Sequence, residues 1–192
     1  MESFMNDNLI NIGGNPNDEF YRYKMSPLKI QVIGKGNGIQ TILTNIEEVS
    51  NAIGHPTEII SKFISYNTGS NWNLSKKTLT GKHDLVTLQD YINEYIQSFV
   101  LCDTCKNPET MYKIEGKKKN INLYVQCASC GYTPKVIIGK SSNDNEKVVK
   151  GKNNEKMINF IQKYIKENPM EMTMEKKEYA KENNLLHEDD IF

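Results

Sequence analysis

Four cysteines, arranged as two Cys-x2-Cys pairs, constrain this chain more than any other feature of its sequence. The pairs are Cys102 with Cys105 and Cys127 with Cys130, and 21 residues separate them. Two such knuckles on the arms of a hairpin bring four thiolates into a tetrahedron, which suits Zn2+ with Zn–S distances of about 2.3 Å. Because every position is a cysteine, none remains for water, and we expect a structural zinc, one per chain.

Disulfides and a redox pair are the alternatives for these cysteines. Residues 1–10 carry two acids and no basic segment of the kind that opens a secretory signal. No apolar run approaches the roughly 18 residues needed to cross a bilayer. The cysteines also lack the βαβ context of a redox motif. We therefore favour zinc, in a cytoplasmic protein with no membrane partner.

The residues around the two pairs predict a ribbon. Residues 109–114 and 121–126 resemble strands, and residues 116–120 form an exposed turn between them. Gly131, directly after the second pair, supplies backbone freedom near the metal. We assign the ribbon to residues 101–140.

Short β-type runs precede the ribbon. Residues 28–33 and 39–46 flank a glycine-rich loop, and residues 72–74 and 78–80 suggest a second hairpin. Together with the helices below, these runs predict a small α+β domain over residues 20–100.

Three helices are expected within that domain. Asn45 and Glu48 resemble a capping pair that opens a helix over residues 46–53, and Pro56 begins a helix that runs to about residue 64. Asp84 is expected to cap a third helix with an apolar stripe at helical spacing, which we assign to the core. The stripe consists of Leu85, Leu88, Tyr91, Ile92, Tyr95, Ile96 and Phe99.

The remaining segments are predicted as connections and tails. Residues 1–19 are polar and rich in asparagine and glycine, and we expect a flexible tail. Residues 141–154 are assigned to a linker, and residues 155–169 to a short helix that ends at Pro169. Residues 170–192 are mostly charged and are expected to form a frayed helix or a disordered tail.

Charge excludes a generic polyanion binder, because 24 basic and 24 acidic residues give a net charge of zero. Local RNA contact remains open through the ribbon lysines Lys113, Lys117, Lys118, Lys119 and Lys135. Of the 24 basic residues, 23 are lysines and only Arg22 is an arginine. Either codon bias removed the other arginines and drift left this one, or Arg22 is retained because it has a function.

A glycine-rich loop superficially resembles a nucleotide-binding cradle. It comprises Gly34, Lys35, Gly36, Asn37, Gly38, Ile39, Gln40 and Thr41. The loop lacks the Gly-x4-Gly-Lys-Ser/Thr spacing and leads into a strand pattern and not into a helix. We favour a hairpin in which Asn37 and Gly38 supply positive φ, and keep nucleotide binding as the weaker alternative.

Three segments together resemble the N-terminal part of eukaryotic translation initiation factor 5. They are Phe-Tyr-Arg-Tyr-Lys-Met at residues 20–25, the glycine-rich loop at 34–41, and residues 99–110 with the first cysteine pair. The similarity runs over about residues 18–140 and more faintly to Pro169. The resemblance implies an α+β domain followed by a zinc ribbon, as the spacing of the residues also predicts.

The resemblance further implies a GTPase-activating protein for initiation factor 2. Arg22 occupies the position of the family's arginine finger, which would act at the GTPase centre of the gamma subunit on GTP that the partner binds. Lys62 matches a family lysine implicated alongside the finger, so the resemblance implies a catalytic role for Lys62 as well; an ordinary solvated helix lysine is the alternative. Gln40 stands where the family has another lysine. The implied partners are the small ribosomal subunit and the initiator tRNA complex. We expect a monomer that does not hydrolyse GTP itself, because no phosphate-cradle or magnesium-binding motif is present.

Two other interpretations stay open. The beta subunit of initiation factor 2 shares the α+β domain and ribbon and would be a structural, tRNA-assisting component. A ribbon that binds RNA is the other. The family's C-terminal helical-repeat domain is expected to be absent, since about 50 residues after the ribbon cannot build it.

Overall fold

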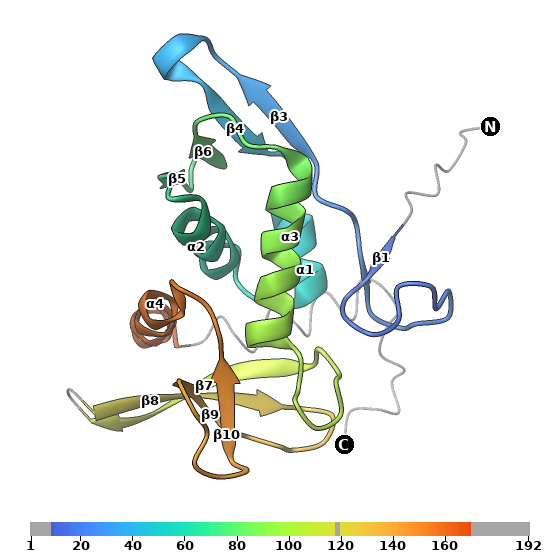
Figure 1. Cartoon of the computed structure of the whole chain (residues 1–192), viewed down its shortest axis with the longest axis vertical. Helices are drawn as coiled ribbons and strands as arrows, with labels where there is room; N and C mark the ends of the chain where they lie inside the picture. Colours follow the sequence, from blue (N-terminus) through green and yellow to red (C-terminus); the bar gives the residue numbers. More distant parts are fainter. Residues whose placement is uncertain (1–8, 118–119, 170–192) are drawn as a thin grey trace.

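The computed structural model describes residues 9–117 and 120–169 of the 192-residue chain. It shows an α+β domain at one end of the long axis and a second, four-stranded sheet at the other (Figure 1). In chain order the elements are β1 (Ile10–Asn11), β2 (Lys24–Met25), β3 (Ile30–Ile33), η1 (Gly36–Gly38), β4 (Gln40–Leu43), α1 (Ile46–Ile53), α2 (Thr57–Thr68), β5 (Trp72–Asn73), β6 (Thr78–Thr80), α3 (Leu85–Tyr95), η2 (Ile96–Val100), β7 (Thr110–Lys117), β8 (Asn120–Cys127), β9 (Lys135–Ile138), β10 (Glu146–Val149) and α4 (Asn154–Glu167). The predicted fold class, α+β with a ribbon and a further helix, is confirmed.

The first sheet contains both predicted hairpins. Its strand order is β3-β4-β6-β5, and every neighbouring pair is antiparallel. The β3–β4 hairpin extends away from the three helices at the top of Figure 1. Side-chain bonds tie β4, the inner strand of this hairpin, to the residues after β6. The buried Thr41 hydroxyl donates to the carbonyl of Gly81 at 2.8 Å and accepts from the amide of His83 at 3.0 Å.

The three helices of this domain begin near their predicted positions, but one of the two predicted caps is wrong. Asp84 caps α3 by accepting from the amide of Thr87 at 3.0 Å, as expected. Asn45 makes no capping bond. Its side chain instead accepts from the amide of Lys29 and donates to the carbonyl of Pro27, at 2.7 and 2.9 Å. Asn45 therefore holds the backbone that leads into β3. The local sequence around Asn45 does not reveal this role.

The second sheet has the order β10-β9-β8-β7. Strands β7 and β8 pair antiparallel over their full length, from Thr110 opposite Cys127 to Lys117 opposite Asn120. Strand β9 meets β8 antiparallel at Lys135 and Tyr124, and β10 runs parallel to β9. Lys118 and Lys119, part of the suggested RNA-binding set, lie outside the described residues.

Two predicted flexible segments are partly ordered. Within the expected tail, Ile10 of β1 pairs with Met25 of β2, and Ile12 is only 1% exposed. The expected linker over residues 141–154 contains β10. Both predictions are wrong where these strands lie, because strands of two and four residues bounded by polar side chains give little periodic signal. The charged tail at residues 170–192 lies outside the described residues.

The last helix, α4, packs against the earlier domain and the ribbon. It spans Asn154–Glu167, close to the prediction of 155–169, and its buried residues Met157, Ile161 and Ile165 recur at helical spacing. In Figure 1 it lies beside α2 and above β8, and contacts join it to both. No helix within residues 9–117 and 120–169 has the length and apolar character needed to span a membrane.

One hydrophobic core connects the α+β domain, the ribbon and α4. His55, 1% exposed, lies at the junction. Its Nδ1 lies 2.7 Å from the hydroxyl of Tyr95 on α3, and its Nε2 lies 3.2 Å from the carbonyl of Thr110 on β7. The Tyr95 hydroxyl also forms a hydrogen bond with the hydroxyl of Tyr112 at 2.9 Å. This buried histidine therefore connects the α+β domain to the ribbon.

Candidate metal centre and the Arg22 loop

The four cysteine sulfurs converge at one end of the ribbon. All four Sγ atoms lie within 4.8 Å of one another, and the pairs Cys102–Cys130 and Cys105–Cys127 are each 3.6 Å apart. A disulfide would need roughly 2.05 Å. Four sulfurs about 2.3 Å from a tetrahedral ion lie about 3.8 Å from one another. The cluster therefore has the dimensions of a metal site with four thiolate ligands.

The two knuckles share one backbone geometry. The amide of Lys106 donates to the carbonyl of Cys102, and the amide of Gly131 donates to the carbonyl of Cys127, each at 3.0 Å. Both donors have positive φ, 61° at Lys106 and 75° at Gly131. The role of Gly131 agrees with its predicted conformational freedom. Lys106 takes the same conformation despite its side chain, and residue type gave no signal for it.

Burial and amide donors act on the thiols in opposite directions. Burial opposes ionisation of Cys102, but the amides of Cys105 and Thr104 donate to its sulfur and lower its pKa to about 7. Burial of Cys127 outweighs the amides that donate to its sulfur and raises the pKa of its thiol. Backbone donors directed at sulfur favour the thiolate, which is the form that binds metals.

Arg22 lies on the exposed loop between β1 and β2, and its two neighbouring tyrosines are fixed. The hydroxyl of Tyr23 donates to Oε1 of Glu109 at 2.6 Å, and Oε2 of Glu109 accepts from Ser129 at 2.5 Å. Burial and Glu109 together raise the pKa of Tyr23, so it stays a donor. The Tyr21 hydroxyl donates to the carbonyl of Ile12 at 3.2 Å. The segment that bears Arg22 is thus tied to the residues beside the second cysteine knuckle.

The Arg22 side chain itself is exposed. Its guanidinium carbon lies 5.6 Å from the centroid of the Tyr23 ring, within the range of a cation–π contact. Phe20, two residues earlier, is 96% exposed. An exposed arginine and an exposed large aromatic side chain two residues apart are residue types that protein interfaces favour.

Lys62 lies on a different face, in a groove between α2 and α4. Its Nζ lies 4.9 Å from the ring centroid of Tyr66 and 5.8 Å from that of Phe160. The groove has a volume of about 510 Å³, and Lys156, Asn159 and Lys163 complete its lining. Three lysines make it a basic surface.

The glycine-rich loop forms the tip of the β3–β4 hairpin. Its positive φ values are at Gly34 (85°) and Gly36 (55°), so the expectation for Asn37 and Gly38 was wrong. A Cβ on Gly34 would lie 2.3 Å from the carbonyl oxygen of Gly38, which explains why the chain needs glycine there. The loop leads into β4, as the hairpin interpretation predicts, and not into the helix N-terminus that a phosphate cradle uses.

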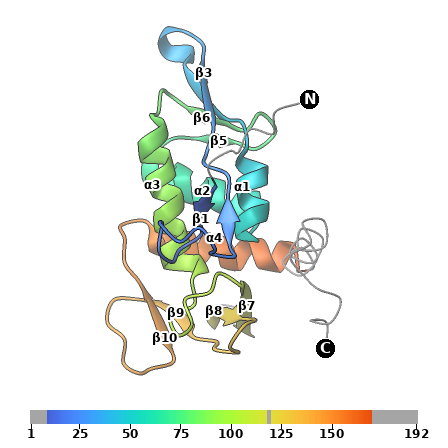
Figure 2. The same cartoon turned by 90° about the vertical axis from the view of Figure 1, so that its right-hand side faces the viewer.

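The three sets of candidate residues are not brought together. The β1–β2 segment, which carries Arg22, lies on the opposite side of α1 and α3 from α2 and α4, which carry the Lys62 groove (Figures 1 and 2). The glycine-rich tip lies at the far end of the long axis from the ribbon. One small ligand could therefore not contact all three, whereas a large partner could contact more than one.

An α+β domain joined to a ribbon with four clustered cysteines defines the class of this protein. The family model for a domain found in initiation factors 2B and 5 matches residues 14–133, more than half of the chain. The chain belongs to this family. The expected resemblance to the N-terminal part of factor 5 is thereby confirmed.

Curated relatives agree with the family match. The chain is 37% identical over 127 residues to "Probable eukaryotic translation initiation factor 5" of Schizosaccharomyces pombe, covering 64% of this chain and 32% of that protein. It is 39% identical over 127 residues to "Eukaryotic translation initiation factor 5" of Drosophila melanogaster, covering 64% and 27%. The factor of the same name in Saccharomyces cerevisiae is 38% identical over 126 residues, covering 64% and 30%. The matched segment thus spans less than a third of each of these relatives.

Proposed function

We propose that this protein is a translation initiation factor that accelerates GTP hydrolysis on initiation factor 2, with Arg22 as the arginine finger. The observation that carries the proposal is Arg22 itself, the sole arginine of the sequence, exposed on a loop that two tyrosines fix in place. The family membership and the names of the relatives support the assignment to translation initiation.

The chemistry of arginine suits this role. A guanidinium is planar and permanently charged, so it stabilises negative charge that develops on the γ-phosphate oxygens in the transition state. A lysine ammonium keeps the charge but lacks the fork of donors. Arginine fingers accelerate hydrolysis by about a thousandfold to a hundred-thousandfold. The protein contributes this one group to a partner that binds GTP and Mg2+, and does not hydrolyse GTP alone.

Lys62 has a separate part in the proposal. Since its groove lies across the helices from the Arg22 loop, we assign Lys62 to binding of the partner assembly and not to the γ-phosphate. Neutralising Lys62 should therefore raise the concentration of protein needed for half-maximal acceleration, while the maximal rate stays the same.

Single-turnover GTP hydrolysis tests the proposal. Initiation factor 2 is preassembled with GTP and initiator tRNA on small ribosomal subunits, and phosphate release is followed with wild-type protein, with Arg22→Lys and with Lys76→Ala as an exposed-cation control. The wild type and Lys76→Ala should accelerate release, and Arg22→Lys should lose most of the effect. Equal acceleration by all three would instead support a binding role of the kind expected for a beta-subunit-like component.

We also propose that the four cysteines hold one structural zinc ion. Their sulfur spacing fits a tetrahedral ion, and four thiolates with no further ligand position suit zinc in a structural site. Elemental analysis of the purified chain should give about one zinc per molecule, and Cys127→Ser should lower it. A folded chain without metal would contradict this assignment.

A further inference from the structure

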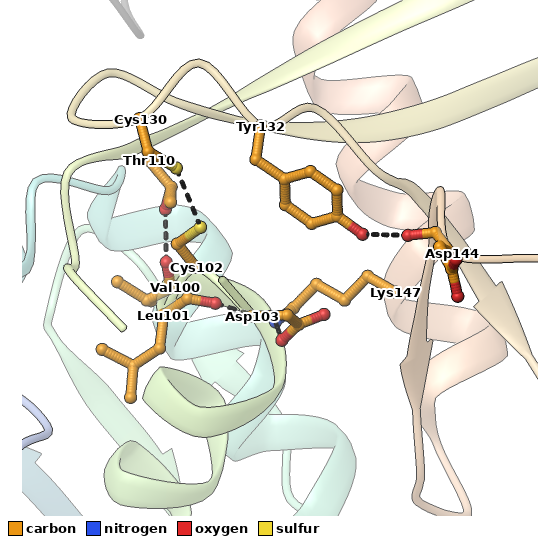
Figure 3. Close-up of polar contacts among 9 residues, drawn as sticks. All are labelled: Val100, Leu101, Cys102, Asp103, Thr110, Cys130, Tyr132, Asp144 and Lys147. Carbon is orange, nitrogen blue, oxygen red and sulfur yellow. Dashed lines mark hydrogen bonds and ion pairs between the residues drawn. The ribbon is translucent and has the colours of Figure 1, made fainter. Parts of the chain in front are cut away.

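The segment over residues 144–149, which contains β10, reaches both cysteine knuckles (Figure 3). It lies beyond residue 133, where the family match ends, and it runs parallel to β9 in register from Glu146 opposite Lys135. Its exposed residues, Asp144 and Asn145, are polar, as expected of a connecting segment. Two of its groups nevertheless bond to residues next to the metal centre.

Lys147 bonds to the first knuckle. Its side chain is 3% exposed, and its Nζ donates to the carbonyl of Leu101 at 2.8 Å and to the Asp103 carboxylate at 2.6 Å. Leu101 and Asp103 flank the ligand Cys102 on either side. A buried ammonium is stable only when such partners surround it, so Lys147 and the first knuckle must keep their relative positions.

Asp144 bonds to the second knuckle. The hydroxyl of Tyr132 donates to the backbone carbonyl of Asp144. Tyr132 follows the ligand Cys130 by two residues, and its own carbonyl accepts from the amide of Cys127 at 2.9 Å. The same six-residue stretch thus holds the backbone on both sides of the sulfur cluster.

We propose that residues 144–149 form a clasp that keeps the two knuckles together, so that Lys147 and Tyr132 are positioning residues for retention of the metal. The inference rests on the proposed metal site. Metal loss requires the knuckles to separate, and with the clasp in place separation also breaks the bonds of Lys147 and Tyr132. Groups that orient metal ligands without touching the metal typically change metal affinity by about tenfold to a hundredfold when removed.

The positive charge of Lys147 should also favour retention of the metal. Four thiolates around one Zn2+ leave a net negative site, and Lys147 offsets the Asp103 carboxylate beside it. In Lys147→Met that carboxylate would remain next to the thiolates without its cation. The double variant Asp103→Asn with Lys147→Met removes the uncompensated charge and should recover part of the loss, which separates the charge effect from the geometric one.

Zinc transfer to a chromophoric chelator tests the clasp on the full chain. We expect Lys147→Met to release zinc about tenfold faster than wild type, and Tyr132→Phe to lie between them. Two controls are matched. Lys150→Met removes an exposed lysine directly after the segment and should match wild type, and Val149→Ala weakens the packing of β10 without removing either knuckle bond.

The outcomes separate the two proposals. If Lys147→Met and Tyr132→Phe release zinc at the wild-type rate, or no faster than Val149→Ala at equal thermal stability, the clasp is wrong while the metal site stands. A wild-type chain that binds no zinc overturns both. If Lys147→Met does not fold, Tyr132→Phe, which loses one hydroxyl, decides the result in the same way.

Discussion

At the scale of single residues, the Arg22 loop is held in position by hydroxyl groups whose hydrogen-bond partners lie far away in the sequence. Tyr23 reaches Glu109, 86 residues later, and Glu109 also accepts from Ser129. This chain of bonds explains how an exposed loop can present one arginine in a defined place. It also connects the proposed catalytic group to the ribbon that carries the cysteine cluster.

Tyr23→Phe removes the first bond of that chain. We expect the free energy of unfolding to fall by about 1 kcal/mol, because a hydrogen bond is lost and Glu109 loses one donor. GTP hydrolysis on the partner should slow, but less than with Arg22→Lys. Denaturant unfolding and phosphate release measure the two effects. Tyr21→Phe, whose bond to Ile12 is longer, is the control; equal or larger losses there would argue against a special role for Tyr23.

The four cysteines of the candidate metal centre could be picked out from the sequence, and the residues that surround them could not. Residue type and spacing identify Cys102, Cys105, Cys127 and Cys130. Lys106 and Lys147 belong to a residue type that is usually solvated, and Lys147 acquires its partners 44 and 46 residues earlier in the chain. Such pairings appear only when the fold brings the segments together.

At the scale of elements, periodic patterns predicted the helices and the longer hairpins. The stripe of α3 correctly predicts the core at Leu88, Ile92 and Tyr95, which recur every three to four residues and are fully buried. It is wrong at Leu85, which is 43% exposed in the first turn of the helix. Strand β10 was missed because its Glu146 and Lys147 resemble a linker. Capping was predictable at Asp84, where the bond is local, and failed at Asn45, whose partners lie across the chain.

The Asp84 cap gives α3 a pH dependence. Its side-chain and backbone bonds from Thr87 lower the pKa of the Asp84 carboxyl. A carboxyl with a lowered pKa in the folded state stabilises the fold above its ordinary pKa of about 3.9, and this contribution is lost as the pH falls through the lower folded value. Asn keeps the capping acceptor but does not titrate.

The stability difference between wild type and Asp84→Asn should therefore shrink as the pH is lowered from about 6 towards 3. Urea unfolding at a series of pH values, followed by far-UV circular dichroism, measures this difference. A difference that stays constant or grows on acidification would show that the charged carboxylate does not stabilise the cap.

At the scale of the whole molecule, the α+β domain and the ribbon share a core and a polar junction. Because His55 connects Tyr95 on α3 with Thr110 on β7, neither part packs independently of the other. The sequence predicted both parts and their order. It did not predict the junction, since a histidine that follows a helix resembles any surface histidine until two distant segments, α3 and β7, enclose it.

His55→Phe tests the junction. The change leaves the buried carbonyl of Thr110 without its ring partner, and we expect a loss of about 1 to 3 kcal/mol in the free energy of unfolding. Tyr112→Phe removes one hydroxyl from the same group and should cost less. Calorimetry measures both variants. Stability equal to wild type in His55→Phe would mean that apolar packing alone joins the two parts.

Metal removal should act on the whole chain for the same reason. With a strong chelator and reductant present, we expect the single unfolding transition to move to lower temperature and to include the α+β domain. Differential scanning calorimetry with and without zinc measures this. An unchanged main transition, with a separate ribbon transition lost on chelation, would show that the parts unfold independently.

We propose above that Arg22 acts on the transition state of GTP hydrolysis in a partner. The most direct measurement is the hydrolysis rate of the preassembled initiation factor 2 complex over a range of concentrations of wild-type protein and of Arg22→Lys. We predict a similar half-saturating concentration for both and a maximal rate lower by at least about a hundredfold for Arg22→Lys. Equal maximal rates, or a change confined to the half-saturating concentration, would contradict the claim and make Arg22 a binding residue.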